Sequence, residues 1–128
     1  MFRSAISFLP ICLICFLVTI PTVARADVSI AGTYAVHGAN PDGTGEYQGR
    51  VAVKPEGDVF LVIWEIGQDY FSGTGVLKGS QFAVVFQSSG GAIGLAHYEI
   101  QPAGSLVGVW VEHGKSRLGT ETWTPAAQ

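Results

Sequence analysis

A histidine and a small set of glutamates are the side chains through which this chain could do chemistry. His97 and Glu99 are two residues apart, so in a β-strand they share a face at a separation of about 7 Å. Such a pair could orient an imidazole or begin a metal site, and it equally fits an outward polar pair in water. Zinc and copper need three or four converging ligands, and the positions of His37, His97 and His113 give no sign of convergence. We therefore predict no metal site.

Glutamates also interrupt three apolar segments, as Glu65, Glu112 and Glu121. A carboxylate buried among apolar side chains is a candidate general acid. Glu65 is close to Gly67, at a strand end that solvent can reach, whereas Glu121 shares its strand face with Trp123 and is the candidate for burial. The chain has no Gly-x-Ser-x-Gly elbow, phosphate-binding loop or His-Glu-x-x-His helix. These features favour a protein that is not an enzyme and needs no cofactor. Catalysis by acidic or histidine side chains at a barrel mouth is the alternative.

Aromatic residues provide the main candidates for binding. Rings interspersed with a few polar groups are typical of small-molecule pockets. The alternative is that the same rings fill the interior of a small domain. We predict a ligand-binding site formed by Glu121 and five aromatic residues, which are Tyr34, Tyr47, Trp64, Tyr98 and Trp110.

The first 26 residues have the form of a cleavable signal peptide. Arg3 supplies a positive start, residues 6–20 form a nearly continuous apolar run, and Ala24-Arg25-Ala26 has the small-x-small pattern of a cleavage site. A transmembrane anchor is the alternative, but the run is short for a membrane span. We predict cleavage after Ala26, a single domain over residues 27–128, and a periplasmic or secreted protein with no membrane span.

Both cysteines, Cys12 and Cys15, lie in the predicted leader, so the exported domain is expected to have no disulfide. Two of the seven basic residues lie there as well, which leaves five basic residues against ten acidic ones. Because no basic stripe is present, we expect neither nucleic acid nor an anionic membrane as a partner. All 17 glycines follow the leader, and this density favours a turn-rich β-protein.

Residues 58–66 are apolar on both strand faces, which predicts a strand that is covered on both. Glycines placed two residues from an aromatic, as Gly49 is from Tyr47, predict alternating small and large side chains inside a closed barrel. Short links rich in turn residues join antiparallel neighbours. We therefore predict an all-β fold, an eight-stranded antiparallel up-and-down (meander) barrel; an outer-membrane barrel is the alternative. The predicted strands cover residues 30–37, 46–54, 58–66, 70–77, 81–87, 93–101, 105–112 and 117–124.

A set of turn and packing motifs resembles small exported alphaproteobacterial proteins that are often labelled fibronectin-binding. The resemblance covers nearly the whole predicted mature chain, but motifs of this kind carry no functional site over. A looser similarity, in shape alone, is to avidin-like and lipocalin-like small barrels; the biotin-binding pattern is not present. The motifs include Gly32-Thr33-Tyr34, Asn40-Pro41-Asp42-Gly43, Gly108-x-Trp110 and Gly119-Thr120-Glu121-Thr122.

The predicted export, the compact barrel and the lack of a catalytic motif together indicate an exported non-enzymatic binding protein. Its ligand would be a small apolar molecule in the barrel or a protein partner on the surface. The outer strand face of Val59, Leu61 and Ile63 is the predicted surface for docking or for self-association into a homo-oligomer. A periplasmic inhibitor of a hydrolase, which would insert the loop at residues 39–44 or 87–92 into an active site, is a second candidate.

Overall fold

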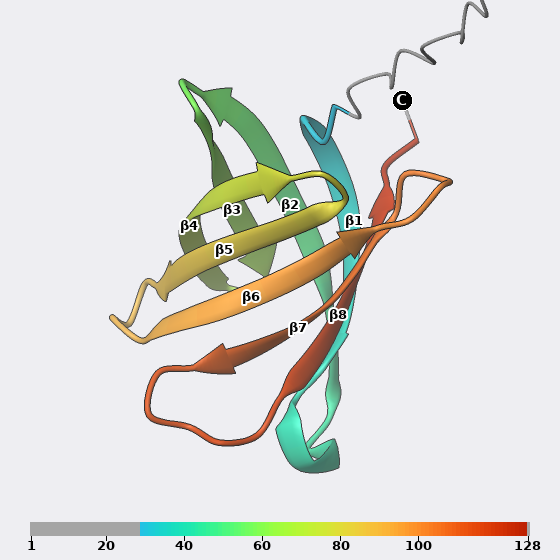
Figure 1. Cartoon of the computed structure of the whole chain (residues 1–128). Helices are drawn as coiled ribbons and strands as arrows, with labels where there is room; N and C mark the ends of the chain where they lie inside the picture. The colour runs from blue at the N-terminus through green and yellow to red at the C-terminus, as the bar shows by residue number, and fades with distance from the viewer. Residues whose placement is uncertain (1–28, 128) are drawn as a thin grey trace, which may run out of the picture.

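Short turns between alternating segments fold residues 29–127, which the computed structural model describes, into eight antiparallel strands and one 3₁₀ turn (Figure 1). Each strand pairs with its neighbour in sequence, and β1 pairs with β8 to close the barrel. The predicted all-β meander barrel is confirmed, whereas the predicted signal peptide lies outside the described residues. The elements are β1 (Gly32–Ala39), η1 (Pro41–Gly43), β2 (Glu46–Glu56), β3 (Val59–Ile66), β4 (Asp69–Lys78), β5 (Gln81–Ser88), β6 (Ile93–Ile100), β7 (Leu106–Glu112) and β8 (Gly119–Pro125).

Two-residue turns set the register of the hairpins on both sides of β3. Gly57 and Gly67 begin these turns with φ of 59° and 61°, a backbone conformation that glycine adopts without steric cost. The second turn places Trp64 opposite Phe71 on the inner face. Turn chemistry visible in the sequence therefore fixes the pairing of β2, β3 and β4.

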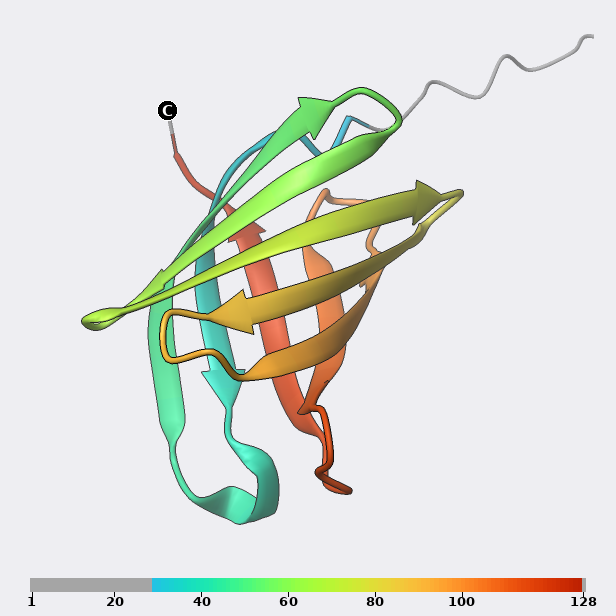
Figure 2. The same ribbon diagram turned by 90° about the vertical axis from the view of Figure 1, so that its left-hand side faces the viewer.

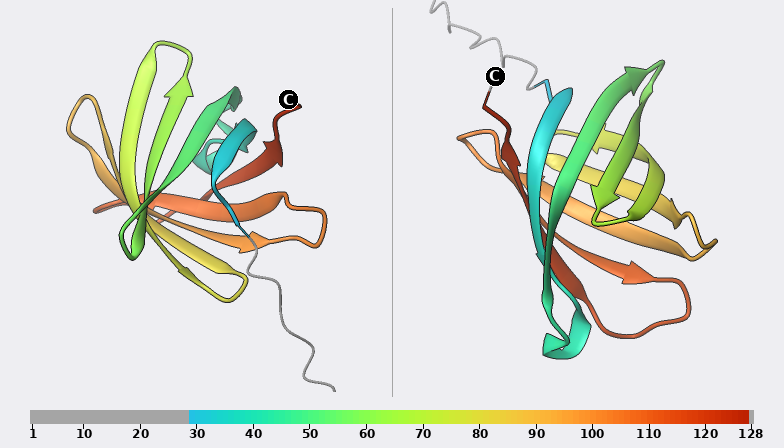
Figure 3. Two further views of the ribbon diagram at one scale, coloured as in Figure 1. Left: turned by 90° about the horizontal axis from the view of Figure 1, so that it is seen from above. Right: turned by 180° about the vertical axis from the view of Figure 1, so that it is seen from behind.

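The closing pair is where the strand bounds differ most from the prediction. Residues 34–39 of β1 pair with residues 120–125 of β8, so β1 begins and ends two residues later than predicted (Figure 3). No turn connects these two strands, and their register follows from closure of the whole sheet. Closure leaves neither strand with an unpaired edge, which protects the sheet from edge-to-edge association.

The two ends of the barrel differ in packing. The filled end carries the β2–β3, β4–β5 and β6–β7 turns, and Trp123 lies there, completely buried among other rings. Its ring centroid is 5.8 Å from that of Tyr34, 6.2 Å from that of Phe82 and 4.3 Å from that of Tyr98. The open end carries the β1–β2, β3–β4, β5–β6 and β7–β8 connections, and Figure 2 shows η1 and the β7–β8 connection together at the bottom.

The prediction that β3 is covered on both faces was wrong. Of its inward residues, Val62 and Trp64 are buried, whereas Ile63 on the outward face is 36% exposed, and Val59 and Leu61 are only half-buried. A closed barrel has a single layer, so nothing in the described part of the chain packs over the outside of β3. More exposed apolar side chains lie on β5 and β6, where Val85 and Leu95 form a cross-strand pair. Within residues 29–127 no helix is both long and apolar enough to cross a membrane.

Candidate ligand-binding site

A cross-strand row of five inward-facing residues forms the centre of the site. Running through β2, β1, β8, β7 and β6, it consists of Tyr47, Gly38, Glu121, Gly108 and Tyr98. A glycine therefore stands on each side of Glu121, and a tyrosine ring lies over each glycine. Neighbouring strands are about 4.8 Å apart, so a tyrosine two strands away reaches the carboxylate only across a position without a side chain. The two glycines thus allow both tyrosines to reach Glu121.

The Glu121 carboxylate accepts four hydrogen bonds although its side chain is buried, with 5% exposed. The Tyr47 hydroxyl donates to Oε2 at 2.6 Å. The other three donors bond to Oε1: the Tyr98 hydroxyl at 2.8 Å, Trp64 Nε1 at 2.9 Å and Trp123 Nε1 in a close contact. An ionised carboxylate only accepts hydrogen bonds, so four converging donors suit the ionised form. All four donors are neutral groups.

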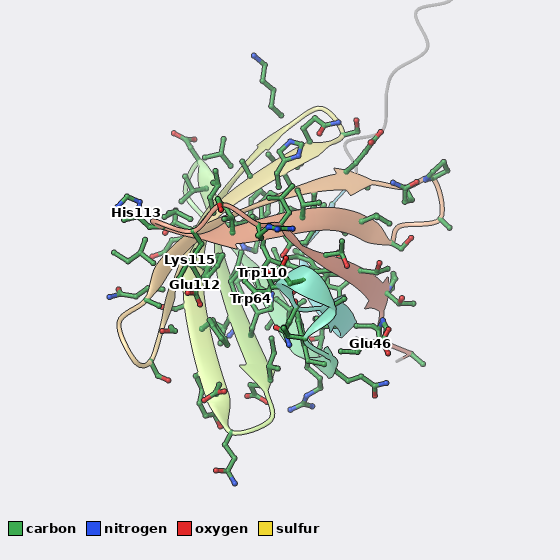
Figure 4. The ribbon with its side chains drawn as sticks, turned by 90° about the horizontal axis from the view of Figure 1, so that it is seen from below. Glu46, Trp64, Trp110, Glu112, His113 and Lys115 are labelled. Atoms are coloured by element: carbon green, nitrogen blue, oxygen red, sulfur yellow. The ribbon has the colours of Figure 1, made fainter. Side chains whose placement is uncertain are left out.

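A cavity of about 290 Å³ lies between this carboxylate and the open end. Edge-to-face contacts link its rings: the Trp64 and Phe86 centroids are 6.1 Å apart, and Phe86 and Trp110 are 6.5 Å apart. Figure 4 looks onto this end, with Trp64 and Trp110 near the middle of the view. The lining consists of Tyr47, Trp64, Phe71, Phe86, Tyr98 and Trp110 on the walls, Asn40, Ile66, Asp69 and Glu112 near the mouth, and Glu121 on the floor.

Trp110 contributes a buried donor with no acceptor. Its Nε1 has no hydrogen-bond partner in the described part of the chain. The indole lies against Gly119, the residue paired with it on β8, where an added methyl group would overlap the ring. A ligand in the cavity, or a small movement of the neighbouring Tyr47 hydroxyl, would provide the missing acceptor.

The structure brings five of the six predicted site residues together around the cavity and leaves out Tyr34. The Tyr34 hydroxyl donates to the Ile30 carbonyl at 2.7 Å, and its ring packs against Trp123 in the filled end. Strand parity correctly places Tyr34 inside, but parity does not give the position along the barrel axis. Tyr34 therefore does not line this cavity.

Sequence reasoning missed Phe71, Phe86 and Trp123. Two signals could have found two of them. The Gly67 turn places Phe71 opposite Trp64, and Trp123 is two residues from Glu121 on the same face. Phe86 depends on the register of β5 against its neighbours, for which the sequence offers less direct signs.

The two tyrosines that bond to Glu121 have altered acidity. Burial raises the pKa of Tyr98 well above its ordinary value, and the charge of Glu121 and the hydrogen bond to it raise this pKa further. The same causes, in the same order, raise the pKa of Tyr47, while the adjacent Trp110 indole acts in the opposite direction. Both hydroxyls therefore stay protonated and act as donors to the carboxylate at neutral pH.

The raised pKa of Tyr98 predicts a loss of stability in alkaline solution. The unfolded chain releases this proton near the ordinary pKa of 10.0, whereas the folded state retains it to higher pH. Between the unfolded and the folded pKa of Tyr98, the folded state binds more protons than the unfolded state. This group therefore lowers the free energy of unfolding by about 1.4 kcal/mol per pH unit in that range. Urea denaturation between about pH 9 and about pH 11.5 measures the fall, and Tyr98→Phe should make it shallower. An equal slope in both proteins would contradict the burial of this hydroxyl.

The remaining polar candidates lie outside the cavity. His97, Glu99 and His37 are exposed on the outer face, and His113 is exposed in the β7–β8 connection. Glu65 also lies on the outside, where its Oε2 accepts a hydrogen bond of 2.9 Å from the guanidinium of Arg50. Its predicted access to solvent is confirmed. Among residues 29–127 no three His, Cys, Asp or Glu side chains lie close enough together to hold a metal ion.

A shallower groove of about 410 Å³ adjoins the cavity, between η1 and the β7–β8 connection. Trp110 and Glu112 line both spaces, and Lys115 and Arg117 line the groove alone. Arg117 forms an ion pair with Asp42 at 3.0 Å, which joins the two segments. The basic side chains at this end therefore lie beside the cavity and do not line it.

Fold and site together define a small closed β-barrel that is packed at one end and has an aromatic cavity at the other. No protein-family model matches the chain, and no curated protein matches it in sequence. The resemblances to fibronectin-binding-labelled exported proteins and to avidin-like or lipocalin-like barrels therefore stay predictions.

Proposed function

We propose that this chain is an exported, non-enzymatic binding protein that holds a small molecule with an apolar body in the cavity at the open end. The observation that carries this proposal is the ring-lined cavity of about 290 Å³. Protein interiors are close-packed, and spaces much larger than a water molecule are few. Concave, mostly apolar sites with a small number of placed polar groups are typical of ligand pockets.

The arrangement of Glu121 supports binding over catalysis. Four hydrogen-bond donors engage its oxygens, which leaves the carboxylate poorly placed to exchange protons with a substrate. None of the histidine, serine or lysine side chains of the described residues lines the cavity. The proposal of export rests on the leader pattern of residues 1–26.

Tryptophan fluorescence tests the proposal, because all three tryptophans line the cavity or bond to its floor. The protein would be expressed from its full-length gene and purified from the periplasm or medium. An intact mass equal to that of residues 27–128 would support export. We expect saturable changes in emission with at least one of toluene, benzyl alcohol, benzylamine and benzoate, and calorimetry would measure each affinity.

Trp110→Ala should weaken that binding by about tenfold, because it removes a large cavity wall. The matched control is Val107→Ala, which shortens an exposed side chain on the outside of the same strand. Absence of saturable binding by all four compounds, or equal affinity in wild type and Trp110→Ala, would overturn the proposal.

A further inference from the structure

We infer that the cavity selects a small organic ammonium ion, with its positive charge near Glu121 and its apolar body against the rings. This inference rests on the proposed binding function and names the chemical class of the ligand. It follows from the charges around the cavity, the acceptor capacity left on Glu121, and the rings of the walls.

The carboxylates that line the cavity form no ion pair within residues 29–127. Glu121 forms the floor, and Asp69 and Glu112 lie near the mouth, whereas no Lys, Arg or His among the described residues lines the space. The two arginine ion pairs of residues 29–127 involve other carboxylates, those of Asp42 and Glu65, and the His37 ring lies near a third, Glu46. A buried charge is normally paired because its desolvation is costly, and a cationic ligand would supply a partner that no described residue of the chain provides.

The two oxygens of Glu121 are unequally engaged. Oε1 accepts three hydrogen bonds, and Oε2 accepts one, from Tyr47. Each carboxylate oxygen offers about two lone-pair sites, so Oε2, which accepts a single hydrogen bond, keeps acceptor capacity while Oε1 is fully engaged. Glu121 lines the cavity, so its carboxylate borders the ligand space.

The walls favour the same class of ligand. Trp64, Trp110 and Tyr47 present aromatic groups to the cavity, and a cation within about 6 Å of such a ring face is attracted by its quadrupole. Rings alone would accept any apolar molecule. Rings around an uncompensated carboxylate favour a cation and repel an anion, and both effects strengthen where water is excluded.

Isosteric ligand pairs isolate the effect of charge. Phenyltrimethylammonium is compared with tert-butylbenzene, and benzyltrimethylammonium with neopentylbenzene, by tryptophan fluorescence and calorimetry on the purified full-length product. We expect the cation to bind at least about tenfold more tightly than its neutral isostere. If neutral and cationic members bind equally, or the neutral member binds better, the charge inference fails while the proposed binding function stands. If none of these compounds nor those of the function test binds, both fail.

Charge-neutralising variants locate the preference. Glu121→Gln keeps a carbonyl oxygen for the three donors at Oε1, and its amide can donate to the Tyr47 hydroxyl, which also accepts. This variant should lose about tenfold more affinity for the cation than for its neutral isostere.

Asp69→Asn and Glu112→Gln alter the mouth without touching the buried network and should each lower cation affinity by about twofold to threefold. Glu99→Gln is the control, because it removes the same charge from the exposed outer face of β6. The inference would be overturned if Glu121→Gln kept the cation preference of the wild type. If Glu121→Gln fails to fold, an unchanged cation preference in both mouth variants would overturn it.

Discussion

Glu121→Ala is expected to lower the free energy of unfolding by about 4 kcal/mol, although it removes a buried charge that has no basic partner. The substitution leaves four donors without their acceptor, two of them indole N–H groups of the buried Trp64 and Trp123. Each unsatisfied buried donor costs about 1–3 kcal/mol. Relief of the carboxylate desolvation and entry of water from the cavity offset part of the sum. The cost of leaving the four donors without an acceptor therefore exceeds the gain from removing the buried charge.

Urea denaturation followed by far-ultraviolet circular dichroism measures this effect. The matched control is Glu112→Ala, which truncates a half-buried glutamate near the mouth whose side chain makes no hydrogen bond within residues 29–127, and it should change stability by less than about 1 kcal/mol. Glu121→Gln should fall between them, at about 1–2 kcal/mol, because it retains an acceptor for the Oε1 donors. A Glu121→Ala protein as stable as wild type would show that the four bonds do not stabilise the barrel.

Gly108→Ala is also expected to destabilise the protein strongly, lowering the free energy of unfolding by about 3 kcal/mol. A methyl group at this position would overlap the Tyr98 ring and the carbonyl oxygen of His97 on the paired strand. The ring can move only by withdrawing its hydroxyl from Glu121, and the backbone carbonyl has no room to yield without distorting the ladder. The cost therefore combines overpacking with the loss of a buried hydrogen bond.

Gly90→Ala is the matched control for this substitution. Gly90 lies in the β5–β6 turn with a negative φ, and the nearest atom to an added methyl group is Ser88 Oγ at 3.8 Å. We expect a change within about 0.5 kcal/mol, measured by thermal and urea denaturation of both variants. Equal stabilities of Gly108→Ala and Gly90→Ala would contradict the close approach of Tyr98 to β7.

The glycine pattern also shows how the structure revised a sequence-based interpretation. The sequence indicates small and large inward side chains in alternation along each strand. In the structure a ring that lies over an inward glycine comes from the neighbouring strand, as when Tyr47 covers Gly38 and Tyr98 covers Gly108, whereas Gly49 lies against Ile66. Alternation within a strand reveals that gaps exist, whereas cross-strand register decides which ring occupies them.

The sequence alone determined the features that depend on local rules. Two-residue periodicity placed Tyr98 and Glu121 on inward faces, and turn residues such as Gly57 and Gly67 separated the strands. Links this short can join only antiparallel neighbours, so the meander followed as well.

Only the tertiary structure decided how far along the barrel axis each inward residue lies. The β1–β8 register has no turn to set it and depends on closure of all eight strands. That register places Glu121 between Gly38 and Gly108, where four donors reach it, and places Tyr34 in the filled end. Side-chain direction is a property of each strand, but convergence on one carboxylate is a property of the closed sheet.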